Sequence, residues 1–269
     1  MLLKRGGIWL FLLIAVVVGT AAFLTPRTPQ PLSYHHFADQ RSWLGIPNFG
    51  DVASNILFLV VGFCGLAFLC RTSSQERFID RSERWPYVFI FLGLLLTACG
   101  SAYYHLAPDN ARLVWDRLPM TAVFMPLVAA IIAERVNVKL GLWLLPVLIA
   151  VGVGSVMQWH LSEKQGAGDV RFYAAVQLYA LLALLAALLL PPRYTRGSDL
   201  LVVAGLYVLA KICEAADRRI FSLGNFLSGH TLKHLAAGAA GFWILRMLQK
   251  RQPVLQSFNQ NSRTKELES

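Results

Sequence analysis

The sequence predicts an all-α membrane protein, in which a bundle of seven transmembrane helices follows one additional N-terminal hydrophobic helix. Of its 269 residues, 56% are hydrophobic and only 15% are charged, whereas about a quarter of the residues in soluble domains are charged. The charged residues also cluster in the gaps between long apolar runs. The net charge of +10 is therefore typical of basic loops between spans, and it does not indicate a nucleic-acid partner.

Eight apolar segments come close to the roughly 20 residues that a helix needs to cross the hydrocarbon core. The weakest is the seventh, which is short and holds Lys211 near its end. The resulting domain prediction is an N-terminal hydrophobic helix over 1–27, a seven-helix membrane domain over 28–250 and a polar cytoplasmic tail over 251–269. The eight segments are 8–24, 52–70, 86–105, 116–133, 140–158, 172–191, 199–214 and 231–247.

The first segment has a basic start followed by a long apolar run, "MLLKRGGIWLFLLIAVVVGT". It could be an anchor that is retained or a signal peptide that is removed. A signal peptide has an apolar run of about 7–15 residues and a clear small-residue cleavage site. This run is longer and its site is indistinct, so the sequence favours a retained helix. Cleavage would leave the other seven spans oriented as before.

The distribution of basic residues favours an orientation with both termini in the cytoplasm. Fifteen of the 25 Lys and Arg residues then fall in inside segments. The others are spread over the outside loops and the adjoining helix ends. This pattern suggests the inner membrane of a bacterium. The inside residues are Lys4, Arg5, Arg71, Arg77, Arg81, Arg84, Arg135, Lys139, Arg193, Arg196, Arg246, Lys250, Arg251, Arg263 and Lys265.

Polar side chains that are costly in a membrane gather at the outer ends of the predicted helices. The third span ends in "CGSAYYHLAPDN", where Ser101 and His105 lie four residues apart on one helix face. The short loop that follows makes the next span antiparallel, which places Asp116 at the depth of His105. The last span starts on the same side with His230 and His234, again four residues apart.

Three neutral imidazoles with one open position are typical of a catalytic zinc site. His230 and His234 could bind one ion from a single helix, and His105 could supply the third ligand. Asp116 could deprotonate a water molecule, and Ser101 could donate a hydrogen bond to a developing oxyanion. Less specific roles remain open for each residue: histidines bonded to the backbone, a serine bonded to the carbonyl one turn earlier, and an aspartate that caps its helix.

The set SxxxH, an Asp at the start of the next helix and HxxxH in the last helix resembles the CREST superfamily of seven-span membrane hydrolases, and most closely its alkaline ceramidases. The stretches "NFGDVASN" (48–55) and "GDVRFYAAVQ" (168–177) are also similar, and the resemblance covers about residues 35–248. It implies a buried zinc held by three histidines, with an Asp and a Ser around the attacking water. It also implies hydrolysis of the amide of an N-acylated membrane lipid, such as ceramide. The residues that match are His105, His230 and His234 for zinc, and Asp116 and Ser101 for catalysis.

One departure concerns the calcium that eukaryotic alkaline ceramidases bind near their first core helix. Asn48 stands where those proteins have a glutamate, and the preceding segment is less acidic. Asp39 and Asn48 could still form a reduced oxygen site for Ca²⁺. The sequence favours the alternative, in which Asp39 pairs with Arg41.

A non-enzymatic receptor or transporter that uses the same His and Asp residues is the rival hypothesis. A transporter more often shows broken helices or paired repeats, and no repeat is apparent here. The sequence indicates no obligate protein partner. Which N-acyl lipid would be the substrate, and what the oligomeric state is, stay open.

Overall fold

The computed structural model describes residues 2–254, and over this range the chain is helical without a strand. Each of the eight predicted hydrophobic helices is present. Short 3-10 helices, η1 (Leu32–His35), η2 (Thr72–Arg77), η3 (Arg81–Glu83) and η4 (Ala187–Leu189), lie between them or extend them. The α-helices are α1 (Leu2–Leu24), α2 (Phe49–Ala53), α3 (Ile56–Leu69), α4 (Arg84–Leu106), α5 (Asn110–Arg135), α6 (Val138–Lys164), α7 (Arg171–Ala186), α8 (Asp199–Ala215), α9 (Asp217–Ser222) and α10 (Gly229–Lys250).

In the described part of the chain, six helical segments are long and apolar enough to cross a membrane: α1, α2 with α3, α4, α5, α6, and α7 with η4. Large apolar side chains such as Trp9 and Trp143 point outward, about 70% and 69% exposed. This is the expected surface of a bundle that faces lipid. The protein is therefore a membrane-embedded helical bundle.

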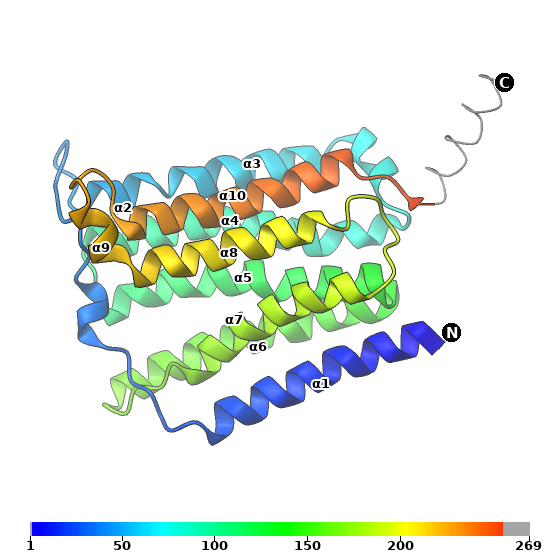
Figure 1. Ribbon diagram of the computed structural model, residues 1–269, viewed down its shortest axis with the longest axis horizontal. Coiled ribbons are helices and arrows are strands. Elements are labelled where there is room, and N and C mark those ends of the chain that lie inside the picture. Colours follow the sequence, from blue (N-terminus) through cyan, green and yellow to red (C-terminus); the bar gives the residue numbers. More distant parts are fainter. Residues whose placement is uncertain (1, 255–269) are drawn as a thin grey trace.

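The two remaining long helices, α8 and α10, run along the same bundle and pack against each other (Figure 1). α8 has 17 residues. α10 is less apolar because its first turns carry His230, Lys233 and His234. The polar side chains in the first turns of α10 thus lower the mean hydropathy of this helix.

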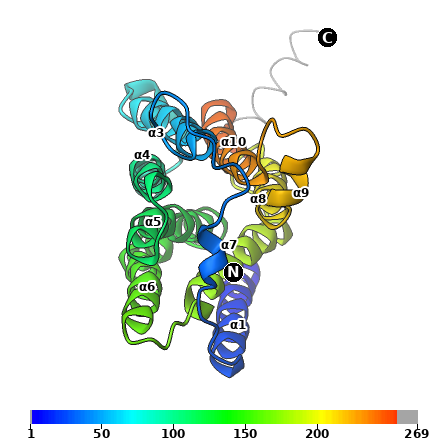
Figure 2. The same cartoon turned by 90° about the vertical axis from the view of Figure 1, so that its left-hand side faces the viewer.

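Successive long helices run in opposite directions along the bundle, and each end of the bundle brings together different helix ends and loops. The start of α1 and the end of α10 lie at the same end of the bundle (Figure 1). Viewed along the bundle, α1 lies at the edge, where it packs against α7 (Figure 2). This position fits a helix that is additional to the main bundle. The opposite end, where α4 finishes and α10 begins, is called the histidine end below.

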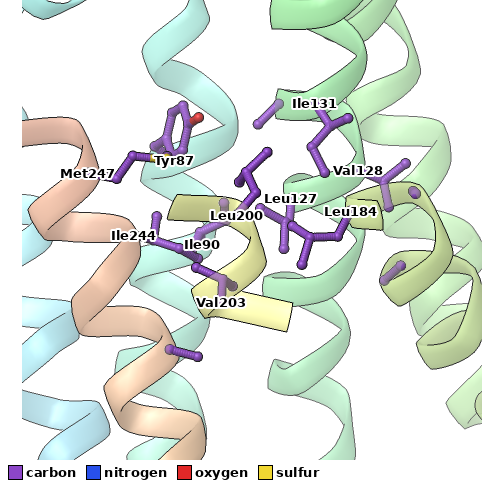
Figure 3. Close-up of a cluster of buried hydrophobic side chains, with 14 of the residues drawn as sticks. Tyr87, Ile90, Leu127, Val128, Ile131, Leu184, Leu200, Val203, Ile244 and Met247 are labelled. Carbon is purple, nitrogen blue, oxygen red and sulfur yellow. The ribbon is translucent and has the colours of Figure 1, made fainter. Parts of the chain in front are cut away.

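The centre of the bundle is a cluster of buried apolar side chains, and the members labelled in Figure 3 come from α4, α5, α7, α8 and α10. Tight packing matters here because apolar burial gives helices in lipid little driving force to associate. At Gly100, a Cβ would lie 1.9 Å from the Trp115 carbonyl oxygen, so α4 and α5 approach closely near the histidine end. The labelled cluster residues are Tyr87, Ile90, Leu127, Val128, Ile131, Leu184, Leu200, Val203, Ile244 and Met247.

Two boundaries differ from the sequence prediction. The fourth span begins at Asn110 rather than at Asp116, because Asp109 caps the helix by accepting the Arg112 N–H at 2.7 Å. The tail does not start at residue 251. The Arg251 side chain is buried in an ion pair with Glu134, and Pro253 forms a bridge with Tyr194. The rest of the predicted tail, 255–269, lies outside the described residues.

Candidate metal centre

Three histidines converge at the histidine end, as the sequence predicted. His105 comes from the last turn of α4, and His230 and His234 come from the first two turns of α10. One ring nitrogen from each histidine lies within 4.8 Å of the corresponding nitrogens of the other two, and all three side chains are buried. The protein therefore has a histidine group that could bind a metal ion.

The start of α10 is fixed by local sequence. The Ser228 hydroxyl accepts the Thr231 N–H at 2.9 Å and so caps the helix. At Gly229, a Cβ would lie 2.2 Å from the Cys213 carbonyl oxygen, so only glycine allows α10 to begin this close to the end of α8. Within α10, the four-residue spacing sets His230 and His234 on one face.

His105 is the strongest sign that a ligand belongs here. Its ring is fully buried, and neither Nδ1 nor Nε2 has a hydrogen-bond partner among the described residues. A buried polar group without a partner is costly. Imidazole nitrogens at about 2.0–2.1 Å from a zinc ion would lie roughly 3.3 Å apart, so the three rings need to close by only about 1.5 Å. The residues present fit a divalent ion that favours nitrogen ligands.

The orientation of His234 depends on the break between α2 and α3. The Asn55 N–H bonds to the Val52 carbonyl, so the Asp51 carbonyl is outside the helical ladder and accepts the Ser54 hydroxyl at 3.0 Å and the Asn55 side-chain amide at 2.8 Å. Nδ1 of His234 lies 3.1 Å from this carbonyl oxygen and 2.8 Å from Ser54 Oγ. With Nδ1 engaged by these two groups, Nε2 is the potential ligand atom.

The Asp51 carboxylate was not singled out as a site residue at the sequence level. It is fully buried, and one oxygen accepts the hydroxyls of Thr231 at 2.8 Å and Ser228 at 3.1 Å. Asp51 thereby ties α2 to the first turn of α10. Its signal in the sequence was a lone acidic residue within the "NFGDVASN" stretch.

Asp116 and Ser101 lie in neighbouring turns of α5 and α4 near the histidine end of the bundle. Asp116 is buried in the second turn of α5, so it does not cap that helix. The Ser101 hydroxyl is buried and forms no hydrogen bond to the preceding turn within the described part of the chain. It lies within hydrogen-bonding reach of the Asp116 carboxylate, although the geometry is not that of a regular hydrogen bond.

The segment 25–48, which connects α1 to α2, packs over the histidine end of the bundle. The Phe37 ring lies 4.7 Å from the His105 ring and 4.4 Å from the His230 ring, measured between centroids. Phe37 is buried, and the nearby Ala38 N–H donates to Asp217 at 2.9 Å. Phe37 carried no sequence signal, because its role depends on how a long loop folds over distant helices.

A cavity of about 250 Å³ extends from Asp116 and Lys233 into the bundle. From Asp116 to Leu127 it follows α5 for roughly 16 Å, at 1.5 Å per residue. Its wall is mainly apolar, with contributions from α5, α7, α8 and α10. This length matches about half of a hydrocarbon core that is ~30 Å thick.

Lys211 forms an ion pair with Glu214, three residues further along α8. The structure adds Lys233, a buried residue whose Nζ lies 2.8 Å from Glu214 and 3.4 Å from Nε2 of His230. The Tyr34 hydroxyl from η1 donates to Glu214 at 3.1 Å. Burial, together with the Glu214 carboxylate, raises the pKa of Tyr34, so this hydroxyl stays protonated.

The two calcium candidates point to different partners. Asp39 forms the predicted pair with Arg41, at 2.7 Å, and the hydrogen bond from Arg41 lowers the pKa of Asp39. The Asn48 amide donates to the His105 carbonyl at 2.8 Å. The Asp39–Arg41 alternative is thus the one present, and the calcium site stays a prediction.

No known protein-family model matches this chain, and a search of curated proteins found no significant match.

Proposed function

We propose that this protein is a zinc-dependent hydrolase that cleaves the amide bond of an N-acylated lipid, such as ceramide or a ceramide-like molecule, within the membrane. The observation that carries the proposal is the buried group of His105, His230 and His234. It lies at the end of the bundle where Asp116 and Lys233 line a mainly apolar cavity, and Lys233 Nζ is 3.4 Å from Nε2 of His230. In this proposal α2 to α10 form a seven-span bundle of the CREST type, and α1 is an additional anchor.

The protein's own residues can perform the required proton transfers. Zinc, when bound, acidifies water and polarises a carbonyl group. Asp116 accepts the proton of the attacking water and returns it to the amine nitrogen as the carbon–nitrogen bond breaks. Ser101 donates its hydroxyl to the carbonyl oxygen as negative charge develops there. The products are a fatty acid and an amine.

The cavity explains why such a site lies inside a membrane protein. Its apolar wall would hold the acyl chain of a substrate drawn from the bilayer, with the amide next to Asp116. Phe37 would exclude bulk water from the histidines. We also propose that both termini face the cytoplasm of a bacterial cell. Fusions of a cytoplasm-active and a periplasm-active reporter to the C-terminus would test this orientation.

The function is tested with purified wild type, His234→Ala and the control His160→Ala, which removes a histidine outside the group. Zinc per chain and fatty acid released from a panel of N-acyl lipids are measured for each. We expect the wild type and His160→Ala to hold zinc and release fatty acid, and His234→Ala to do neither. Equal zinc in all three would refute the ligand set. Bound zinc without turnover of any lipid would favour the receptor hypothesis.

A further inference from the structure

Arg117 is a buried cation whose charge no carboxylate of the bundle neutralises directly. It follows Asp116 in α5, is 6% exposed and lines the large cavity. It forms no ion pair within the described residues, and its Nη1 has no hydrogen-bond partner there. An unpaired guanidinium at this depth is costly, so it marks a functional site.

Four segments of the chain hold this guanidinium in place. Its central carbon lies 4.2 Å from the ring of Trp159 in α6, 4.9 Å from that of Tyr173 in α7, and 5.7 Å from that of Tyr34 in η1. Gln30 accepts a hydrogen bond from Nη2. These neighbours are aromatic or neutral, so they orient the cation without cancelling its charge.

The other charges on the cavity wall leave a positive surplus. Glu214 is already bound by both Lys233 and Lys211. With Arg117 and Asp116 included, the wall carries three positive and two negative side chains, a net charge of +1. The polar end of the cavity is therefore suited to an anion.

We propose that Arg117 binds a carboxylate on the amine side of the scissile amide, so that the preferred substrates are single-chain N-acyl amino acids. This inference rests on the proposed amide hydrolysis and names its substrate class. The planar guanidinium matches a planar carboxylate. Because Arg117 follows Asp116 in the chain and both line one cavity, the amide and the carboxylate need only a short spacer between them.

Binding is measured first, on full-length protein in lipid nanodiscs after removal of metal with a chelator, so that nothing is hydrolysed. The probes are N-palmitoyl glycine and N-palmitoyl ethanolamine, which share an acyl chain and differ in headgroup charge. We expect wild type to bind the glycine lipid about tenfold more tightly or better. Arg117→Gln should lose this preference, Arg117→Lys should keep part of it, and the control Arg112→Gln on the same helix should keep it fully.

Equal affinity of wild type for the two lipids would overturn the inference, and so would an equal loss for both in Arg117→Gln, which would indicate a positioning role. Tighter binding of a lysophosphatidic acid than of N-palmitoyl glycine would overturn the inference that the anion bound by Arg117 is a carboxylate. Turnover of the metal-loaded protein separates the two proposals. If the protein prefers the glycine lipid but hydrolyses neither lipid, the role of Arg117 is supported and the hydrolase proposal is refuted. If it hydrolyses both lipids without a preference, the hydrolase proposal is supported and the role of Arg117 is refuted.

Discussion

The two ends of the bundle both bury charged and polar side chains, but they satisfy them differently. At the end near residue 251, Arg251 is 1% exposed and pairs with Glu134, while Glu83 pairs with Arg193 at 2.7 Å and with Tyr194. Two cations face two carboxylates, and the Arg251 guanidinium also lies 4.0 Å from the Tyr194 ring. Among the fully buried polar side-chain atoms of this network, only Nη2 of Arg251 lacks a partner within residues 2–254.

The histidine end has many more unpartnered atoms. Both ring nitrogens of His105, the Ser101 hydroxyl, one oxygen of Asp51 and Nη1 of Arg117 are buried without partners in the described part of the chain. Native proteins rarely leave such groups unpaired unless a ligand, an ion or water supplies the partner. The Arg251 end thus satisfies its buried charges within the protein, whereas the histidine end leaves buried polar atoms that a ligand, an ion or water would have to satisfy.

The largest expected effect comes from His105→Ala, which removes the ring that has no protein partner. We expect bound metal and any amide hydrolysis to fall to background. The thermal stability of the metal-free protein should change little or rise, because an unsatisfied polar group is lost. Metal analysis and thermal unfolding of chelated samples measure both quantities. A metal content unchanged from wild type would break the contrast between the two ends.

Arg251→Ala should lower the stability of the fold and leave the metal content unchanged. Removing one partner of a buried ion pair costs roughly 3–5 kcal/mol, because the other charge is left unpaired. We expect the free energy of unfolding in detergent to fall by about this amount, while the protein that remains folded keeps its full metal content. Arg246→Ala, five residues earlier in α10 with its guanidinium over the Trp243 ring, is the control. Loss of metal in folded Arg251→Ala would show that the two ends are coupled.

Ser54→Ala should sharpen the account of how His234 is oriented. The substitution removes one of two partners of Nδ1 and leaves the Asp51 carbonyl. Groups that orient a metal ligand typically contribute 10–100-fold to metal affinity, so we expect a loss of about tenfold in a chelator competition. Ser155→Ala, whose hydroxyl bonds to the Gly152 carbonyl, should not change the affinity. A Ser54→Ala affinity equal to wild type would mean that the carbonyl alone fixes the ring.

The smallest effect concerns Asp39 in the segment that covers the histidine end. Because Arg41 lowers the pKa of folded Asp39, the pair stabilises the fold above the unfolded pKa of about 3.9 and loses this contribution as the pH falls through the folded pKa. Asp39→Asn should therefore melt slightly below wild type at pH 7. The gap should shrink as the pH falls below about 4. A gap that stays constant down to pH 2.5 would exclude titration of this pair.

Features that depend on local sequence could be predicted well. The apolar runs predicted all eight long helices because a segment that lies in lipid must satisfy its own backbone, whatever its neighbours are. The four-residue spacings of Ser101 with His105 and of His230 with His234 fixed which side chains share a face. The Lys211–Glu214 and Asp39–Arg41 pairs join residues only two or three positions apart, and both are present.

What only the tertiary structure decided are contacts between distant segments. The Phe37 ring packs on His105, 68 positions further along the chain. The Asp51 carbonyl contacts His234 across 183 positions, and Gln30 accepts a hydrogen bond from Arg117 across 87 positions. Arg251 belongs to the bundle for the same reason, through Glu134. The sequence by itself determined the helices and the faces of the site residues, since these follow from backbone geometry within a few turns. Which buried polar atoms find partners depends on how the helices pack, and the packing thereby decided at which end of the molecule such atoms stay without a partner.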